Sequence, residues 1–449
     1  MKRVLKVFRP APHIARLPQE KITAKYKLMR WQVFFGIFFG YVSLYFLRNN
    51  FSLAMPYMLQ EGFSKTQLGL VFSALPLAYG ISKFIMGAVS DRSNPRYFMT
   101  VGLIISALIN LFYGTNFILS SISLMFILMF FNGWCQGMGW PASARVIVHW
   151  FSKKERGTKT ALWGTAVNIG GGLVALLVNL GLMIFASWHS IFYFPAIISL
   201  VIAIFVWLTV RDTPQSEGLP PIEEHKKHHY ENIITSTSKN YEEELSTKEI
   251  LFKYVFVNKY LWYLALANMF VYIIRYGVIN WIPTYLTQAK EFTPSASRWA
   301  YFLCEFAGIA GTVLGGWLSD QFFHTRRAPV GIIFMFIVTI GILAYWFVPR
   351  GYHLADCVTL IVVGCAIYGP ILMIYVSAMD MVPKKAAGTA AGLVGLFGYV
   401  GGAVLANAGV GYIVDRLGWD GGFVLLLISC GLTILFFALT WEAKANASF

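Results

Sequence analysis

The sequence predicts an all-α membrane protein with twelve transmembrane helices in two pseudo-symmetric six-helix halves. Three observations lead to this fold class. Apolar residues make up 57% of the 449 residues and charged residues only 13%, which leaves too little polar surface for a soluble protein of this length. The apolar residues fall in blocks of membrane-spanning length. A set of residues in the first half of the chain also recurs at a nearly constant offset in the second half.

The apolar blocks give the positions of the spans. Stretches such as Phe98–Phe117 and Val330–Val348 carry almost no charge and approach the ~20 residues that cross a bilayer core. Twelve spans are expected, at 31–58, 68–88, 97–117, 122–145, 158–181, 189–210, 258–283, 297–319, 329–348, 355–378, 387–410 and 420–441. Because this number is even, both termini are expected on the same side of the membrane.

The charge distribution indicates which side that is. The formal net charge is +15, and the basic residues gather in the N-terminal tail and in short loops between apolar blocks. This positive-inside pattern puts both termini in the cytoplasm and argues against nucleic acid as a partner. Residues 1–30 are basic and polar, without a short apolar core before a cleavage site, so no signal peptide is expected.

The chain is expected to contain five parts. They are a cytoplasmic tail, a six-helix half, a cytoplasmic linker, a second six-helix half and a C-terminal tail, at 1–30, 31–210, 211–257, 258–441 and 442–449. The linker is polar and contains a cluster at His225–His229, which has metal-binding residue types but is better explained as part of a solvated segment. The five cysteines lie singly in apolar segments, so we expect neither a metal nor a cofactor.

The repeat is the most informative feature of the sequence. Arg48 and Pro56 recur 227 residues later as Arg275 and Pro283. Further matches at offsets of 229 and 231 residues are Gly87 with Gly316, Asp91 with Asp320, Gly157 with Gly388, and Gly170 with Gly401. The offset between matched residues rises only from 227 to 231 along the chain. We therefore interpret the halves as parallel repeats around a shared midplane site.

Arg48 and Arg275 lie well inside their predicted spans, at matching depths in the two halves. An arginine at the bilayer centre costs about 3 kcal/mol or more, so it usually faces a cavity or a partner. No acidic residue lies near either arginine in the sequence, and guanidinium groups form paired hydrogen bonds with phosphate. We therefore favour a phosphate or carboxylate bound between them. The alternative is that one or both reach the outer interface and only anchor their helices.

Two further ionisable residues lie within predicted spans. Lys83 is a third intramembrane cation, which either draws in the anion or holds a carboxylate in some conformational states. Glu305 is an intramembrane acid. It is a candidate ion partner of Lys83 or an arginine in one state, and the alternative is a protonated, hydrogen-bonded structural carboxyl.

Tyrosines on the presumed cavity helices are candidate hydrogen-bond donors to phosphate or hydroxyl groups. Each is equally well explained as a packing or interface aromatic. They are Tyr41, Tyr45, Tyr79, Tyr272, Tyr276 and Tyr368.

A loop motif is expected to act on conformation and not on substrate. The segment from Gly87 through Asp91 and Arg92, with its echo ending at Asp320, resembles the cytoplasmic loop of major facilitator proteins, where the acid and bases clamp helix ends in one state. The glycine-rich segments lack the strand and the lysine of a phosphate-binding loop and are better read as close helix packing. No arrangement of residues suggests catalysis, so the protein is not expected to be an enzyme.

Nine motifs spread over nearly the whole chain resemble the organophosphate:phosphate antiporter family of the major facilitator superfamily. They are Phe8–His13, Gly36–Tyr41, Ser82–Gly87, Ser90–Arg96, Gln136–Pro141, Arg211–Gln215, Arg275–Gly277, Pro383–Thr389 and Trp419–Phe423.

The resemblance implies a monomeric rocker-switch carrier of the bacterial inner membrane, in contact with lipids. It would import glycerol 3-phosphate while inorganic phosphate leaves. Arg48 and Arg275 match the two phosphate-binding arginines of the family, and Lys83 matches the lysine of its second span. The conformational role of Glu305 remains one of the two alternatives above.

Three positions depart from the pattern of the family's glycerol phosphate carriers. Val167 stands where a histidine is usual, Gly164 where an asparagine is usual, and Asn280 where an aspartate is usual. These departures leave the organic part of the substrate and the pH dependence open. Other candidate functions are therefore transport of a hexose phosphate or a phosphonate, or a transporter-like sensor of phosphate esters.

Overall fold

The computed structural model describes residues 8–90, 92–225, 249–323, 326–383 and 386–441. Within these ranges all regular structure is helical. The helices of the first half are α2 (Gln19–Gln60), α3 (Lys65–Ser90), α4 (Pro95–Tyr113), α5 (Asn116–Leu119), α6 (Ile122–Gln136), α7 (Gly139–Trp150), α8 (Lys153–Gly164), α9 (Ala166–Phe185) and α10 (Ser190–Thr209). The linker contributes η1 (Pro214–Glu217) and η2 (Ile250–Val255). The second half contains α13 (Lys259–Ile279), α14 (Ile282–Ala289), α15 (Pro294–Gln321), α16 (Arg327–Phe347), α17 (His353–Asp380), α18 (Ala387–Leu396), η4 (Phe397–Ala403), η5 (Leu405–Gly409) and α19 (Val410–Leu439).

The helix starts follow from the local sequence. At the start of α4, the Asn94 side chain accepts a hydrogen bond from a backbone N–H, and Pro95 occupies the first helical turn. At the start of α8, Ser152 and Glu155 form a reciprocal capping box. These caps separate consecutive apolar blocks into individual helices.

The predicted fold class is confirmed. Nine helical segments of the described chain are long and apolar enough to cross a membrane. One of them, Ala387–Leu439, contains two crossings, because Gly418 has a φ of 71° and breaks the helix between them. The long helices α2 and α3, which carry Arg48 and Lys83, complete the set of twelve.

Several elements differ in detail from the sequence expectation. Helix α2 begins at Gln19 and not near residue 31, because Ile22, Tyr26 and Met29 are buried on one side of its first turns. The predicted fourth and fifth spans each form two consecutive helices. The predicted eleventh span contains the π-helical segments η4 and η5, within a glycine-rich stretch.

The N-terminal tail and the start of the linker pack on each other at the cytoplasmic side predicted above. The Asp212 carboxylate accepts hydrogen bonds from the backbone N–H of Ala11 at 2.9 Å and from Arg145 Nε at 2.9 Å. Arg16 and Glu224 form a bidentate pair with two 2.7 Å hydrogen bonds, which raises the pKa of the Arg16 guanidinium. The remainder of the predicted His/Lys cluster, after His225, lies outside the described residues.

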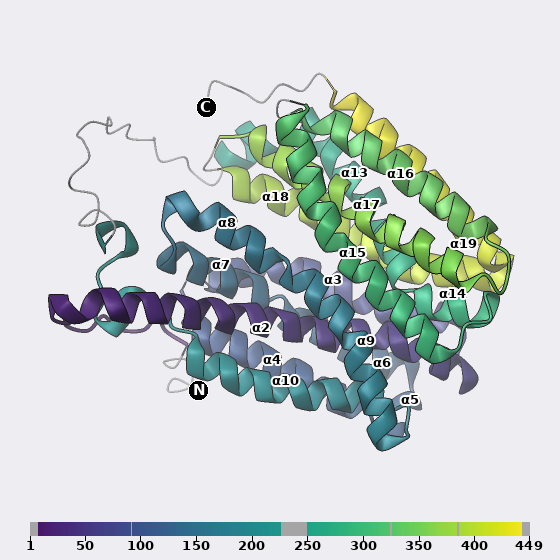
Figure 1. Cartoon of the computed structure of the whole chain (residues 1–449), viewed down its shortest axis with the longest axis horizontal. Helices are drawn as coiled ribbons and strands as arrows, with labels where there is room; N and C mark the ends of the chain where they lie inside the picture. The colour runs from purple at the N-terminus through teal and green to yellow at the C-terminus, as the bar shows by residue number, and fades with distance from the viewer. Residues whose placement is uncertain (1–7, 91, 226–248, 324–325, 384–385, 442–449) are drawn as a thin grey trace.

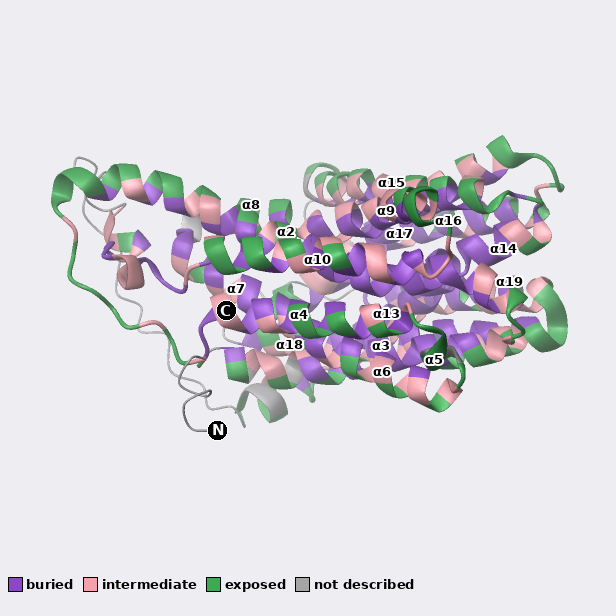
Figure 2. Cartoon of the chain, turned by 90° about the horizontal axis from the view of Figure 1, so that it is seen from below, coloured by how far each residue is buried: buried purple, intermediate pink, exposed green. Residues whose placement is uncertain are grey.

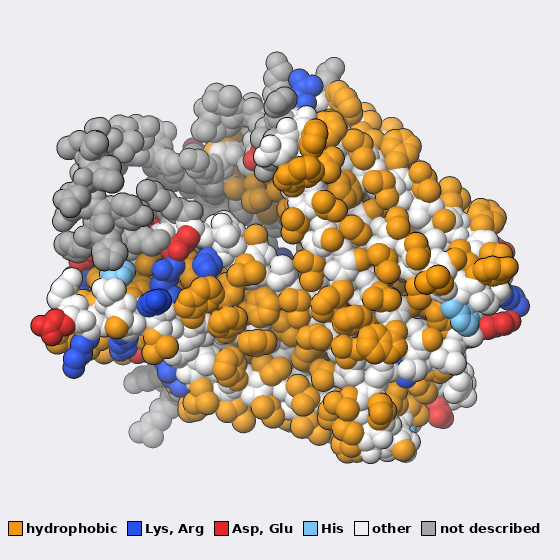
Figure 3. Space-filling view, in the orientation of Figure 1, with side chains coloured by type: hydrophobic (Ala, Val, Ile, Leu, Met, Phe, Trp, Pro, Cys, Tyr) orange, Lys and Arg blue, Asp and Glu red, His pale blue; other side chains and the backbone are white. Residues whose placement is uncertain are grey.

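The two halves form separate helix bundles that meet along a shared face (Figure 1). They lie against each other at the end of the molecule that holds α14, and they diverge towards the end that holds α8 and α18 (Figure 1). Buried residues gather between the helices, whereas exposed ones face outwards (Figure 2). Apolar side chains cover most of the visible outer surface, and Lys and Arg gather near the N-terminal tail (Figure 3). This surface suits a bilayer, with the basic end at the membrane boundary.

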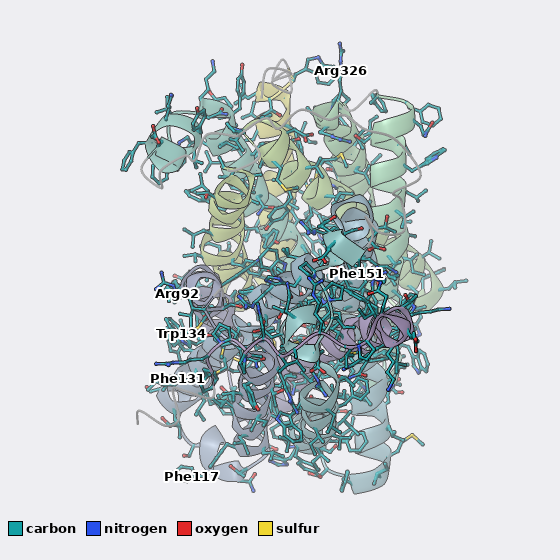
Figure 4. The ribbon with its side chains drawn as sticks, turned by 90° about the vertical axis from the view of Figure 1, so that its left-hand side faces the viewer. Arg92, Phe117, Phe131, Trp134, Phe151 and Arg326 are labelled. Atoms are coloured by element: carbon teal, nitrogen blue, oxygen red, sulfur yellow. The ribbon has the colours of Figure 1, made fainter. Side chains whose placement is uncertain are left out.

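The loop motif is only partly described. Asp91 and the Asp320 side chain lie outside the described residues. Arg92 is exposed on the first half, well separated from Arg326 of the second half when the molecule is viewed from its N-terminal-tail end (Figure 4). The clamping role expected of Asp91, Arg92 and Asp320 therefore stays a prediction.

Candidate binding site between the two halves

Arg48 is buried in the middle of α2, with 4% of its surface exposed. Its Nε donates a 2.8 Å hydrogen bond to Oε1 of Gln136, on α6. Its guanidinium lies over two aromatic rings, 4.8 Å from the centre of Tyr45 and 4.3 Å from that of Tyr79. The contacts described for Arg48 are thus with neutral groups.

Arg275 is equally buried on α13, with 6% of its surface exposed. Its Nη2 donates a 2.8 Å hydrogen bond to the hydroxyl of Tyr368, and that hydroxyl donates at 2.9 Å to Oε2 of Glu305. The Nε of Arg275 is buried and has no hydrogen-bond partner among the described residues. Arg275 therefore retains a free donor beside a hydroxyl that connects it to a carboxylate.

Glu305 is 2% exposed and lies where the halves meet. Its Oε1 accepts a 3.5 Å hydrogen bond from Asn49, the residue next to Arg48. Its backbone carbonyl accepts a 3.1 Å hydrogen bond from Asn168 on α9. A short chain of polar groups thus links the neighbour of Arg48 to Arg275, and both arginines face the interior and not lipid.

A cavity of about 10 Å³ lies beside Arg48, with room for about one water molecule. Residues from both halves line it: Arg48, Asn49, Phe72, Leu75, Pro76, Tyr276, Asn280, Tyr399 and Asn407. Tyr276 also lies under Arg275, whose guanidinium carbon is 5.1 Å from the centre of its ring. The same tyrosine therefore contacts the cavity and the second arginine.

Lys83 is half-buried and surrounded by aromatic rings. Its Nζ lies 4.6 Å from the ring centre of Trp140, 6.0 Å from that of Tyr79 and 5.9 Å from that of Tyr399. The described ion pairs do not include one between Lys83 and Glu305. In this conformation Glu305 interacts with Asn49, Tyr368 and, through Tyr368, Arg275.

The remaining tyrosines named from the sequence are buried close to these groups. The hydroxyls of Tyr41 and Tyr79 lie 3.3 Å apart, and the hydroxyl of Tyr272 lies 3.3 Å from that of Tyr375. Tyr399 contacts the rings of Tyr79 and Tyr272. The tyrosines thus form a ring-lined wall shared by the two halves.

Sequence reasoning missed the neutral polar residues of this site. Asn49, Gln136, Tyr399 and Asn407 all contact an arginine or line the cavity. The available signal was the presence of uncharged polar side chains in apolar spans. Carboxamides are less costly in a bilayer than charges, so they stand out less in a sequence.

Side chains close the end of the molecule away from the N-terminal tail, here called the outer end. Arg298 on α15 donates a 2.9 Å hydrogen bond to the Tyr57 hydroxyl and another to the Asn179 side chain, both in the first half. Asp415 on α19 accepts two 2.6 Å hydrogen bonds from Thr66. The helices of the two halves also pack closely near this end, since a Cβ on Gly69 would lie 2.3 Å from the backbone carbonyl oxygen of Asn407. The outer end is therefore closed.

At the opposite end the two helix bundles diverge (Figure 1). The helices α8 of the first half and α18 of the second half lie at this end (Figure 1). Within the described residues, no group of three or more His, Cys, Asp or Glu side chains is arranged to hold a metal ion.

Comparison with known proteins gives consistent matches. The family model described as Major Facilitator Superfamily matches residues 37–406. The chain is 56% identical to the glycerol-3-phosphate transporter of Bacillus subtilis (strain 168) over 99% of both chains. It is 46% identical to the glycerol-3-phosphate transporter of Haemophilus influenzae, covering 95% of this chain and 94% of that protein.

More distant matches broaden the picture. A probable hexose phosphate transport protein of Chlamydia muridarum is 41% identical over 98% of both chains. Among solved structures, a bacterial homologue of the human lysosomal transporter Spinster, inward-facing and unoccupied, superposes with a TM-score of 0.72 at 17% identity, covering 92% of this chain and 95% of that one. At this identity the structural match supports the fold alone.

Proposed function

Because the chain belongs to the Major Facilitator Superfamily and, within it, to the organophosphate:phosphate antiporter family, we propose that it imports glycerol 3-phosphate in exchange for inorganic phosphate. The family and the relatives named as transporters make the chain a multi-pass bacterial membrane transporter and not an enzyme. The proposal adds the substrate pair, the direction of transport and the residues that bind the shared phosphate.

One observation carries the proposal. Two arginines at repeat-related positions, one from each half, are buried between the halves at 4% and 6% exposure. The described contacts of Arg48 are uncharged, and Arg275 keeps an unpartnered Nε. A phosphate contacting both would satisfy their donors with charge-assisted hydrogen bonds. Phosphate and a phosphate ester share this group, so both can use the same site in turn.

The closed outer end supports alternating access. In this conformation the site is shielded from the outer side by Arg298, Asp415 and their partners, and the halves diverge at the other end (Figure 1). An anion that bridges both halves stabilises conformations in which the two arginines are close. This lowers the barrier for the halves to rock between inward-open and outward-open states. We place both termini in the cytoplasm on the basis of the basic tail.

Lys83, half-buried and ringed by aromatic groups, is assigned to attracting the anion towards the arginines. The tyrosines Tyr41, Tyr45, Tyr79, Tyr272 and Tyr368 are assigned to hydrogen bonding and to shaping the path around them. A hexose phosphate is the second candidate substrate, because a relative with that description is 41% identical.

Counterflow in proteoliposomes tests the proposal. Vesicles loaded with unlabelled phosphate should accumulate labelled glycerol 3-phosphate, and vesicles without internal phosphate should not. Glucose 6-phosphate added outside should compete weakly if the glycerol ester is the preferred substrate. Accumulation that does not depend on internal phosphate would contradict exchange. Binding without any counterflow would identify a sensor instead.

A further inference from the structure

Three asparagines line the cavity beside Arg48 and form an uncharged polar group in the buried interior between the two halves. Asn49 comes from the first half, and Asn280 and Asn407 come from the second. All three are buried, with exposures of 4%, 3% and 1%. Carboxamides that gather in an apolar interior must satisfy one another or a ligand.

The hydrogen bonds of Asn280 and Asn407 show which of their side-chain atoms are already in use. Asn280 Nδ2 donates to Asn407 Oδ1 at 2.7 Å, and Asn407 Nδ2 donates to the carbonyl oxygen of Phe72 at 3.3 Å. These bonds fix the Asn407 side chain between the two halves. The side-chain oxygen of Asn280, Oδ1, has no described hydrogen-bond partner, and Asn280 lines the cavity.

A second polar atom in the cavity wall lacks a partner. The hydroxyl of Tyr276 is buried and accepts or donates no hydrogen bond among the described residues, although the side chain is 9% exposed. A buried hydroxyl without a partner is unfavourable, so it is expected to bond to a ligand or an ordered water. The cavity thus presents a free carbonyl oxygen and a free hydroxyl within a neutral wall.

The chemistry of this wall selects its ligand. Apart from Arg48, which the proposed function assigns to the phosphate, the lining contains no charged side chain, so it does not suit a second anion or a cation. An acceptor beside a hydroxyl suits an alcohol, which can donate to the first and bond to the second. The cavity of about 10 Å³ holds one group the size of a water molecule or a hydroxyl.

From these observations we propose that the cavity formed by Asn49, Asn280, Asn407 and Tyr276 is a subsite for a hydroxyl group of the organic part of the phosphate ester. The inference rests on the proposed function, because it takes the phosphate of the same molecule to bind at Arg48 and Arg275. The ester then points its hydroxyl towards the closed outer end, where Asn407 contacts Phe72 of the first half. The subsite is assembled from both halves, so a hydroxylated ester contacts both of them beyond its phosphate.

The test compares two esters that differ only in their hydroxyls. Inhibition of labelled phosphate exchange in phosphate-loaded proteoliposomes is measured with glycerol 3-phosphate and with propyl phosphate. The measured quantity is the ratio of the two inhibition constants within one protein, so a general loss of rate or of folded protein cancels. A site built to hydrogen-bond a hydroxyl discriminates against an analogue that lacks it. In the unaltered protein, we expect glycerol 3-phosphate to inhibit about tenfold more strongly.

The variants locate this discrimination. Asn280→Leu, which keeps the side-chain size, should bring the ratio close to one, and Tyr276→Phe, which removes a single hydroxyl, should lower it about threefold. Asn268→Leu is the matched control, because Asn268 lies on α13, the helix that carries Tyr276 and ends just before Asn280, and bonds to the Val394 carbonyl away from the cavity. It should keep the ratio of the unaltered protein. The Tyr276→Phe result decides the matter if Asn280→Leu does not fold.

The outcomes separate the two proposals. A ratio near one in the unaltered protein, or an unchanged ratio in both Asn280→Leu and Tyr276→Phe, overturns the hydroxyl subsite while phosphate exchange itself still supports the proposed function. Absence of phosphate exchange in the unaltered protein overturns the proposed function, and the subsite with it. Loss of discrimination in Asn268→Leu as well would assign the effect to helix packing and overturn the subsite.

Discussion

Arg48 and Arg275 occupy equivalent places in the two halves, yet their surroundings differ in charge. Arg48 donates to the neutral amide of Gln136, whereas Arg275 is connected through the Tyr368 hydroxyl to the Glu305 carboxylate. The repeat thus preserves the cation at each position but not its partner. The proposed anion would meet one arginine that bonds to neutral groups and one that is linked through a hydroxyl to a carboxylate.

This difference indicates a division of roles. Under the proposed function, we expect Arg48 to be the first contact of the anion, because no charge has to be displaced from it. Arg275 is engaged more fully when its link to Glu305 weakens, and Glu305 also accepts a hydrogen bond from Asn49 of the other half. Under the proposed function, we therefore expect anion binding at Arg275 to be coupled to this contact between the halves.

The largest expected effect comes from removing either guanidinium fork. Arg48→Lys and Arg275→Lys keep the charge but lose the paired hydrogen bonds, and we expect at least about thirtyfold lower phosphate exchange in each, from a loss of about 2–5 kcal/mol. Arg96→Lys serves as control, because Arg96 bonds to the Trp207 carbonyl at the end of the molecule that holds the N-terminal tail, away from the proposed site. Exchange in either site variant at the level of this control would refute the assignment of the arginines.

The charge difference between the two environments can be removed by giving Arg48 a carboxylate as well. In Gln136→Glu, the 2.8 Å contact becomes an ion pair that competes with phosphate. Phosphate binding should weaken about tenfold or more, since a hydrogen bond between charged groups contributes about 1.5–3 kcal/mol. Isothermal titration with phosphate measures this, and Gln136→Leu, which adds no charge, is the matched comparison. Equal weakening in both variants would show that only the shape of the side chain matters.

The opposite change should act in the opposite direction and less strongly. Glu305→Gln removes the carboxylate near Arg275 and keeps one acceptor oxygen, which can face either Asn49 or Tyr368. We expect phosphate to bind about threefold to tenfold more tightly, because the carboxylate acts through an intervening hydroxyl at short range. Isothermal titration with phosphate measures this change in affinity. Weaker binding in Glu305→Gln would mean that the carboxylate orients Arg275 and does not compete with the anion.

An effect of similar size is expected at the outer end, which is closed in the same conformation in which Asn49 bonds to Glu305. Arg298→Gln weakens its bonds to Tyr57 and Asn179, so the outer-open population should rise about threefold to tenfold. In a cysteine-free background, a single Ser52→Cys reports opening, because Ser52 is fully buried here. Labelling by a membrane-impermeant maleimide should be faster in Arg298→Gln. An unchanged labelling rate would show that the bonds of Arg298 do not hold the outer end closed.

Much of the fold could be predicted from the sequence, because a bilayer imposes length and apolarity on each span. The apolar blocks and the repeat of Arg48 with Arg275 were sufficient for twelve helices in two halves. Helix ends were less predictable. The first turns of α2 are polar on one side, so only their packing reveals that the helix begins at Gln19.

The candidate site could be predicted only in part. Charged residues such as Arg48, Arg275, Lys83 and Glu305 are rare enough in apolar spans to attract attention. The pairing of Glu305 with Tyr368 and Asn49 could not be predicted, because it joins helices distant in the chain. Asn280 was notable only as a departure from a family pattern, and its place beside Asn407 required the structure.

The central claim is that one phosphate is shared by two arginines, and a binding measurement on purified protein tests it most directly. Titration with inorganic phosphate is performed on the unaltered protein, on Arg48→Gln, on Arg275→Gln and on the double variant. The account predicts one phosphate per chain, a loss of at least about thirtyfold in affinity for each single variant, and a double variant little worse than either. Two phosphates per chain, or losses in the single variants that simply add in the double variant, would contradict it.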